Sequence, residues 1–258
     1  MLINAVVIVL REVLEASLIM SLFLAYSQHV TVSRLSLLFG IVLGGLFAWA
    51  YAVHISTVSN WFDGVGQEVI NAGLQLAIYF VLLGFITQAL IGVSRPIERI
   101  TLISLMVLGI VLASIREGSE IVLFITGFSS APDLLQPVLI GSAIGAGIGI
   151  SVGVCIYYLL VTMSFKNSVR VGYVLTLLIA AAMISQVVQQ LIQADWIVSE
   201  YPLWDTSNWI NERSITGQLL YALIGYEATP TPIQVTAYFS AIAMIVFVSF
   251  YQISRKTK

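Results

Sequence analysis

Seven stretches of mostly apolar residues, each about 20 to 30 residues long, constrain this chain more than any other feature. A helix of about 20 apolar residues crosses the hydrocarbon core of a bilayer. Only 9% of the residues are charged, whereas soluble domains contain roughly 25%. We therefore expect one all-α integral membrane domain over residues 1–258 with seven transmembrane helices. The predicted spans are 2–27, 35–54, 69–92, 101–128, 134–163, 169–194 and 233–253.

Basic and acidic residues fall on opposite sides of the predicted spans. With the N-terminus outside, Arg213 is the single basic residue in an outer loop. Because Lys and Arg are enriched in cytoplasmic loops, the pattern predicts an N-out, C-in, multi-pass protein of the cytoplasmic (inner or plasma) membrane. Outer acids could gather cations, or they could simply solvate the loops. The basic residues on the predicted inner side are Arg34, Arg95, Arg99, Lys166, Arg170, Arg255, Lys256 and Lys258.

The first six spans contain an internal repeat with an offset of 105 residues. Residues 1–99 form the first predicted three-helix unit and residues 100–195 the second. Because three spans are an odd number, the second unit is inverted relative to the first, as in many secondary transporters with a binding site at the midplane. The residues that match across the repeat are Arg11 with Arg116, Gly40 with Gly145 and Gly44 with Gly149.

The remaining chain forms two further parts. Residues 196–232 are long and polar for a hairpin connection and are predicted to be an external loop. Within this loop, Ser214 or Thr216 could cap a short helix that stops at Gly225, and the apolar run between them predicts that it lies on the outer membrane surface. Residues 233–258 provide the seventh span and a cytoplasmic tail.

Both repeats place the pattern Arg-Glu-x-x-Glu inside an apolar helix, as "REVLE" at 11–15 and "REGSE" at 116–120. Side chains three and four residues apart share a helix face, so the two glutamates of each motif project together. Each charge costs a few kcal/mol inside a membrane and needs a partner. The motifs contain two more carboxylates than guanidinium groups. This leaves one uncommitted carboxylate per motif for a proton or a metal ion.

The residue types indicate which metal would suit such a site. Carboxylate oxygens prefer hard cations, whereas His, Cys and Met suit copper and zinc. The chain has two His and one Cys, so a hard or borderline cation such as iron fits best. The structural alternative is a buried salt-bridge cluster that locks span one to span four. Two motifs at symmetric positions of an inverted repeat favour the functional interpretation.

The motifs "REVLEA" and "REGSE", and the segment "PLWDTSNWINERSITGQLLYALIGYEATPTPIQVTAY" at 202–238, resemble the oxidase-dependent iron permease family of the yeast high-affinity iron permease and bacterial EfeU-type proteins. The resemblance covers the whole chain. It implies transport of iron, as Fe³⁺ or Fe²⁺, into the cell without a permanently bound cofactor. It also implies a separate external protein that oxidises or delivers the iron. The implied iron ligands are Glu12, Glu15, Glu117 and Glu120, which Arg11 and Arg116 orient.

A stripe of glutamines follows one face of the predicted sixth span, at positions 186, 189, 190 and 193. Such a stripe lines a pathway or hydrogen-bonds neighbouring helices. We interpret Gln186, Gln189 and Gln190, together with Glu68, as candidate pathway residues, and Asn71 and Gln75 as a weaker hint of the same kind. Many bacterial relatives carry a His and a Glu in this span, where this chain has Gln189 and Gln190 instead. Glutamine side chains offer carbonyl oxygens but bring no charge.

Other functions fit the sequence less well. A retinal protein needs a buried lysine in the last span, and none lies there. The chain has no HExxH, GxSG or GxGD motif, so we do not expect an enzyme, and no basic patch predicts binding of nucleic acid. Two alternatives of the same architecture stay open: a transporter of another divalent cation, such as manganese, and a proton-coupled carrier. A membrane scaffold that packs through the glycine-rich fifth span is a further alternative.

Overall fold

The computed structural model describes residues 1–30, 32–92, 96–198 and 200–256, and in this part of the chain the regular elements are helices without a strand. Arg95 and Lys258, which contribute to the predicted inner charge, lie outside the described residues. The helices are α1 (Leu2–Val30), α2 (Arg34–Val53), α3 (Ile55–Ser59), η1 (Phe62–Gly64), α4 (Gly66–Ile91), α5 (Pro96–Thr126), α6 (Pro132–Thr162), α7 (Phe165–Gln193), α8 (Ile215–Ile224) and α9 (Pro232–Lys256).

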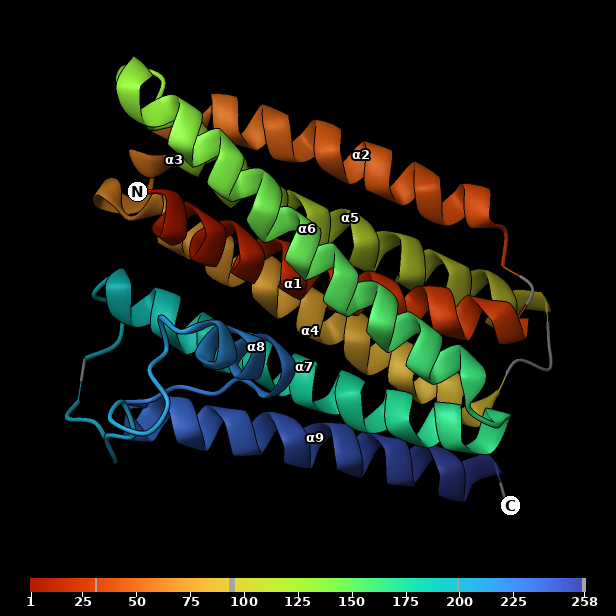
Figure 1. Ribbon diagram of the computed structural model, residues 1–258. Helices are drawn as coiled ribbons and strands as arrows, with labels where there is room; N and C mark the ends of the chain where they lie inside the picture. Colours follow the sequence, from red (N-terminus) through yellow and green to blue (C-terminus); the bar gives the residue numbers. More distant parts are fainter. Residues whose placement is uncertain (31, 93–95, 199, 257–258) are drawn as a thin grey trace.

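The seven long helices run side by side along one direction (Figure 1). The N-terminus, α3, α8 and the connection from α7 to α9 lie at one end of the bundle, and the C-terminus lies at the other (Figure 1). Each predicted span forms one of these helices, with ends within five residues of the prediction. Six of them, α2, α4, α5, α6, α7 and α9, are long and apolar enough to cross a membrane. Helix α1 is as long but carries three charged residues.

Glycines bring two pairs of helices into close contact, α6 with α1 and α2 with α5. A Cβ atom at Gly145 would lie 2.4 Å from the carbonyl oxygen of Val6, and one at Gly44 would lie 2.5 Å from the Cβ of Ser114. Larger residues would therefore push these helices apart. The glycines belong to the pairs that match across the 105-residue offset. Each of them faces the helix that carries the charged motif of the other predicted repeat.

Serine hydroxyl groups strengthen the contact between α1 and α6. The Ser17 Oγ donates a hydrogen bond to the carbonyl oxygen of Gly149 at 3.0 Å, and the Ser21 Oγ donates to that of Gly153 at 2.7 Å. The absence of a side chain at both glycines leaves these carbonyl oxygens within reach. These two bonds hold α1 to α6 after its charged motif, and the close contact of Gly145 with Val6 holds the two helices together before it.

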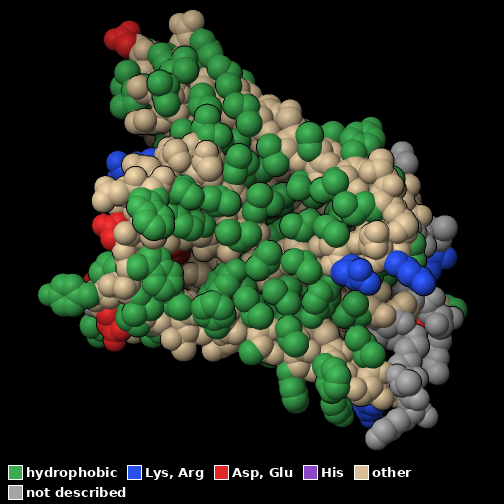
Figure 2. Space-filling view, turned by 60° about the horizontal axis from the view of Figure 1, so that its bottom comes forward, with side chains coloured by type: hydrophobic (Ala, Val, Ile, Leu, Met, Phe, Trp, Pro, Cys, Tyr) green, Lys and Arg blue, Asp and Glu red, His purple; other side chains and the backbone are tan. Residues whose placement is uncertain are grey.

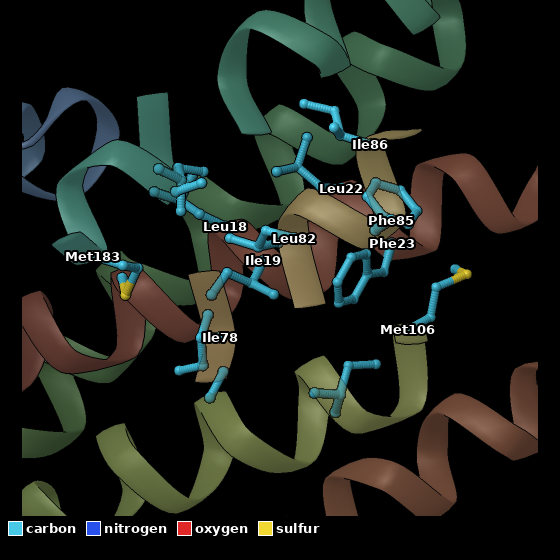
Figure 3. Close-up of a cluster of buried hydrophobic side chains, with 14 of the residues drawn as sticks. Leu18, Ile19, Leu22, Phe23, Ile78, Leu82, Phe85, Ile86, Met106 and Met183 are labelled. Atoms are coloured by element: carbon cyan, nitrogen blue, oxygen red, sulfur yellow. The ribbon is translucent and has the colours of Figure 1, made fainter. Parts of the chain in front are cut away.

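The apolar core lies between the charged motifs and the end of the bundle with the C-terminus. On α1 it includes Leu14, within the first motif, and continues from Leu18 toward the end of that helix. Figure 3 shows side chains from α1, α4, α5 and α7 that converge there. Such a core leaves little room for water or ions below the motifs. The labelled residues are Leu18, Ile19, Leu22, Phe23, Ile78, Leu82, Phe85, Ile86, Met106 and Met183.

The surface carries an apolar belt between two charged ends. Figure 2 shows hydrophobic side chains across the middle of the molecule, with acidic groups toward the left end and most Lys and Arg side chains toward the right end. The left end is the one that contains the N-terminus and the connection from α7 to α9 (Figure 1). The charge separation that the sequence predicts is therefore present along the bundle axis.

The predicted short helix is present as α8. The Ser214 Oγ accepts a hydrogen bond from the Gly217 N–H at 3.0 Å, and Gly225 ends the helix with a left-handed φ of +69°. These are the cap and the stop that the sequence indicates. Helix α8 packs against α1 and α7, and it buries Tyr221 and Ala222. The helix therefore contacts the bundle directly beside the first charged motif.

Candidate functional site

The two Arg-Glu-x-x-Glu motifs meet in the middle of the bundle. Arg116 of α5 reaches across to α1, where its Nη1 atom lies 3.2 Å from the Glu12 Oε2 and 3.4 Å from the Glu15 Oε2. The same guanidinium group contacts Glu117, and its Nη2 atom lies 3.4 Å from the Glu120 Oε1. A single guanidinium group thus touches all four glutamates that the sequence singles out.

Burial separates these side chains into an interior group and an edge. Arg116 is 1% exposed, Glu15 and Glu117 are 2% exposed, and Glu12 is 4% exposed. The Glu120 side chain is 26% exposed, so this carboxylate is the most exposed of the four. Taking charges out of water is costly unless each has a partner. The contacts of Arg116 supply that partner for the three interior carboxylates.

The carboxyl groups also lie close to one another. That of Glu12 is within hydrogen-bonding reach of those of Glu117 and Glu120. Carboxylates at this distance repel unless a proton or a cation lies between them. The arrangement therefore suits exchange of a proton or a metal ion among groups from both helices.

Arg11 has a different environment from Arg116. Its Nε atom lies 3.4 Å from the Glu15 Oε1, the contact four residues along the helix that the sequence predicts. Its Nη2, however, donates a hydrogen bond to the Tyr221 Oη at 2.7 Å, and its guanidinium carbon lies 4.1 Å from the centre of the Tyr221 ring. The Arg11 side chain is 30% exposed. It therefore joins the motif to α8 and not to the opposite motif.

Amide side chains complete the site. The Gln186 Nε2 donates to the Glu15 Oε2 at 3.1 Å, and the Gln75 Nε2 donates to the Gln186 Oε1 at 2.6 Å. Gln75 is fully buried, and in the alternative orientation of its amide the oxygen takes the place of this Nε2 and accepts from the Arg116 Nη2 at 3.1 Å, in place of the donation to Gln186. Gln75 therefore lies between Gln186 and Arg116 and links α7 to α5.

A second polar chain connects Glu120 with the end of the bundle that contains the N-terminus. The Asn71 Nδ2 donates to the Glu120 Oε1 at 3.4 Å, and the Tyr51 Oη donates to the Asn71 Oδ1 at 3.3 Å. Glu68, in the first turn of α4, is close enough to Tyr51 to interact with it electrostatically. These groups form a polar route from that end toward the most exposed motif glutamate.

The structure distinguishes among the candidate pathway residues. Gln186 contacts a motif glutamate directly, whereas Gln189 and Gln190 form no hydrogen bond with the motifs in the described part of the chain. Asn71 and Gln75, which the sequence favours only weakly, both contact the site. Tyr51 and Tyr221 are not indicated by the sequence. Tyrosines occur in many apolar helices, so their presence alone does not point to a site. Only the folded structure places these two beside the motifs.

A polar group outside the spans lies close to the site. Glu227, between α8 and α9, accepts hydrogen bonds from the Gln234 Nε2 at 2.7 Å and the Ser185 Oγ at 3.4 Å. Ser185 precedes Gln186, so neighbouring residues of α7 hold Glu227 and Glu15. Burial, and then repulsion from Glu212, raise the pKa of the Glu227 carboxyl to about 7. This group therefore changes its charge near neutral pH.

The arrangement of the glutamates bears on metal binding. Among the described residues, no three His, Cys, Asp or Glu side chains are positioned to hold a metal ion together. The carboxylate oxygens of the motifs point instead toward Arg116. In this conformation the Arg116 guanidinium group therefore neutralises the motif carboxylates. A metal cation could bind the same oxygens only by displacing Arg116 from them.

A protein-family model matches much of the chain. The model of the Iron permease FTR1 family matches residues 97–254, which is more than half of the chain. The matched region contains the second charged motif, the glycine-rich helix α6, the glutamine stripe and α8, whereas the first motif lies before it. No curated protein and no solved structure matches the chain.

Proposed function

The chain belongs to the iron permease FTR1 family, and on that premise we propose that it carries iron across the cytoplasmic membrane into the cell through the glutamates of its two charged motifs. The family is one of transporters and not of enzymes, and six apolar helices make the protein an integral, multi-pass membrane protein. The observation that supports this specific route best is the single guanidinium group of Arg116, which contacts four carboxylates from α1 and α5.

The proposed architecture has seven spans, N-out and C-in, with two inverted repeats. Helices α1, α2 and α4 correspond to α5, α6 and α7. The contact of α1 with α6 then corresponds to that of α5 with α2, and both contain the matched glycines. Likewise, α7 supplies an amide to Glu15, and α4 supplies one to Glu120. These paired contacts are the ones that a two-fold relation between the repeats requires.

Helix α1 is proposed as a span in addition to the six apolar helices, despite its charges. Its length of 29 residues exceeds the ~20 that a bilayer needs. The two glutamates are buried against Arg116, and Arg11 contacts Glu15 and Tyr221. Because ionisable groups in membranes face the bundle interior and pair with one another, these partners offset the cost of placing the motif at mid-membrane depth.

The transport step that we propose begins at Glu120. Iron, as a hard or borderline cation, prefers carboxylate oxygens, and it would meet the most exposed glutamate after passing Glu68, Tyr51 and Asn71. It would then displace Arg116 from the other carboxylates. The apolar core below the motifs closes the route toward the end with the C-terminus (Figure 3). Release therefore requires a rearrangement that opens this core between α1, α4, α5 and α7.

Two points extend the proposal beyond the metal site. The family resemblance suggests an external protein that oxidises or delivers the iron, at the end of the bundle with α8. Proton coupling is a second candidate feature, because the Glu12 carboxyl group lies within hydrogen-bonding reach of Glu117 and Glu120. A proton shared among these groups would have to leave when a cation binds.

Uptake of labelled iron into cells or vesicles tests the proposal. Native protein is compared with Glu12→Gln and Glu117→Gln at equal expression, with Glu200→Gln, an exposed residue of the α7–α9 connection, as the control. We expect both motif variants to lose uptake and the control to keep it. Unchanged uptake in both motif variants would return the motifs to a structural role. A parallel manganese assay separates iron transport from transport of divalent cations in general.

A further inference from the structure

A tyrosine of α2 lies beside the most exposed motif glutamate. The Tyr51 Oη donates a hydrogen bond to the Asn71 Oδ1 at 3.3 Å, and the Asn71 Nδ2 donates to the Glu120 Oε1 at 3.4 Å. The phenol group is also close enough to Glu120 to interact with it electrostatically. A side-chain amide therefore bridges a phenol oxygen and a carboxylate oxygen at the edge of the motif cluster.

The place of Tyr51 in the fold suits contact with an incoming ion. It lies in the last turn of α2, at the end of the bundle that contains the N-terminus (Figure 1). Helix α2 packs against α5, which carries Glu120, and the phenol group reaches across to Asn71 of α4. Tyr51 is half-buried, whereas Asn71 is buried. Side chains from three helices thus meet where the polar route from that end reaches the motifs.

The hydroxyl group of Tyr51 has a different kind of partner from those of two other tyrosines in long helices. The Tyr79 Oη donates to the main-chain oxygen of Ala241, and the Tyr238 Oη donates to that of Ile224. Such bonds satisfy main-chain groups and hold elements together. The bond of Tyr51 ends on a side chain that itself contacts a candidate iron ligand. It can therefore be exchanged for a bond to an ion without the loss of a main-chain contact.

The chemistry of a phenol group fits this exchange. A bound cation stabilises the anionic form of its ligand, so a coordinating phenol loses its proton. Tyrosine is among the residues that ligate haem iron in proteins, and phenolate and carboxylate oxygens are both hard ligands. An ion that takes the place of the proton between Tyr51 and Asn71 gains a phenolate oxygen and an amide oxygen, with the Glu120 carboxylate beside them.

We propose that Tyr51 is a further iron-binding residue, whose phenolate oxygen completes the shared site at Glu120. In this step the bond between Oη and its hydrogen breaks, a bond forms between Oη and the ion, and the proton passes to water at the exposed edge of the site. No electron is transferred. Tyr51 extends the site of the four glutamates and does not form a second one. The inference rests on the proposed function for the identity of the ion.

Visible absorption of the purified full-length protein loaded with Fe³⁺ tests this contact. A ferric ion bound to a phenolate absorbs visible light, because charge moves from the oxygen to the metal, and carboxylates alone give no comparable band. We expect this band in the native protein, and we expect Tyr51→Phe to lose it and to bind Fe³⁺ severalfold more weakly. Tyr79→Phe is the matched control, because it also removes one hydroxyl group from a long helix but should keep the band.

The amount of bound iron, measured in every sample, separates this inference from the proposed function. If native protein binds iron without the band, or if Tyr51→Phe keeps the band, the role of Tyr51 is overturned while the route through the glutamates stands. A band that is lost only in Tyr221→Phe would likewise overturn it, because the phenolate would then lie beside Arg11. Native protein that binds no iron would overturn the proposed function and this inference with it.

Discussion

The two charged motifs have the same Arg-Glu-x-x-Glu spacing but very different surroundings. Arg116 is buried and contacts glutamates of both helices, whereas Arg11 is partly exposed and turns toward Tyr221 of α8. Helix α8 lies outside both predicted repeats and packs against α1. Helix α8, which follows the repeats in the chain, thus gives Arg11 and Arg116 unequal roles although the repeats place them at matching positions. Arg116 belongs to the centre of the site, and Arg11 belongs to its edge.

The largest expected difference is between the two arginines themselves. Arg116→Ala leaves three buried carboxylates without their cation, and removal of one partner of a buried ion pair costs about 3–5 kcal/mol. Arg11→Ala loses the hydrogen bond to Tyr221 and the contact with Glu15, but Glu15 keeps Arg116 and Gln186 as partners. We therefore expect a smaller loss, about 1–2 kcal/mol in all. Unfolding of the purified proteins in detergent, followed by tryptophan fluorescence, measures both. Equal losses of stability would show that the two motifs are equivalent.

The amide contact of Glu15 can be broken without changing any charge. Gln186→Leu removes the donor to a buried carboxylate, which we expect to lower the free energy of unfolding by about 1–3 kcal/mol and to reduce iron uptake severalfold. Gln190→Leu, on the same helix but without a bond to the motifs, is the control and should change both quantities less. If Gln190→Leu reduces uptake more than Gln186→Leu does, the stripe lines the pathway at another level than the motifs.

The contact between Arg11 and α8 predicts a smaller effect. Tyr221→Phe keeps the ring under the guanidinium group but removes the hydroxyl that accepts its hydrogen bond. The loss of stability should be about 0.5–1.5 kcal/mol, and Tyr221→Ala, which also removes the ring, should cost more. Iron uptake assays of the two variants then show whether the edge of the site affects transport. An undiminished stability in Tyr221→Ala would mean that α8 does not hold Arg11.

A further expected difference is a pH dependence at the edge of the site. The pKa of Glu227, about 7 in the folded protein, exceeds its unfolded value of 4.5. The protonated form is thus favoured by folding, and its contribution to stability is lost as the pH rises from about 4.5 through 7. Glu227→Gln should remove this part of the pH dependence. The melting temperatures of native protein and variant, measured at pH 5, 6 and 8, should converge at low pH and favour the variant at pH 8.

Much of the fold follows from the sequence because the bilayer sets the length of a helix. The seven predicted spans match seven long helices, and Ser214 and Gly225 mark the ends of α8 through local chemistry alone. The spacing of each motif likewise predicts the contacts of Arg11 with Glu15 and of Arg116 with Glu120. Such local features depend on helix geometry and not on how the helices are arranged.

The other features of the site depend on helix rotation and register, which one sequence does not specify. The stripe on α7 contains four glutamines, and only the packing of α7 places Gln186 rather than Gln189 or Gln190 against Glu15. Gln75 meets Gln186 because α4 and α7 pack together. The contact of Arg11 with Tyr221 joins residues 210 positions apart. No periodicity in the chain indicates such a contact.

The most direct test of the central claim is the stoichiometry of iron binding to the purified protein. If the two motifs form one shared site, native protein binds one iron ion per chain, and Glu12→Gln or Glu117→Gln each abolish that binding. The double variant is then no worse than either single variant, because both glutamates serve the same ion. Two ions per chain, with each single variant losing only one of them, would contradict a shared site and with it the proposed route through the bundle.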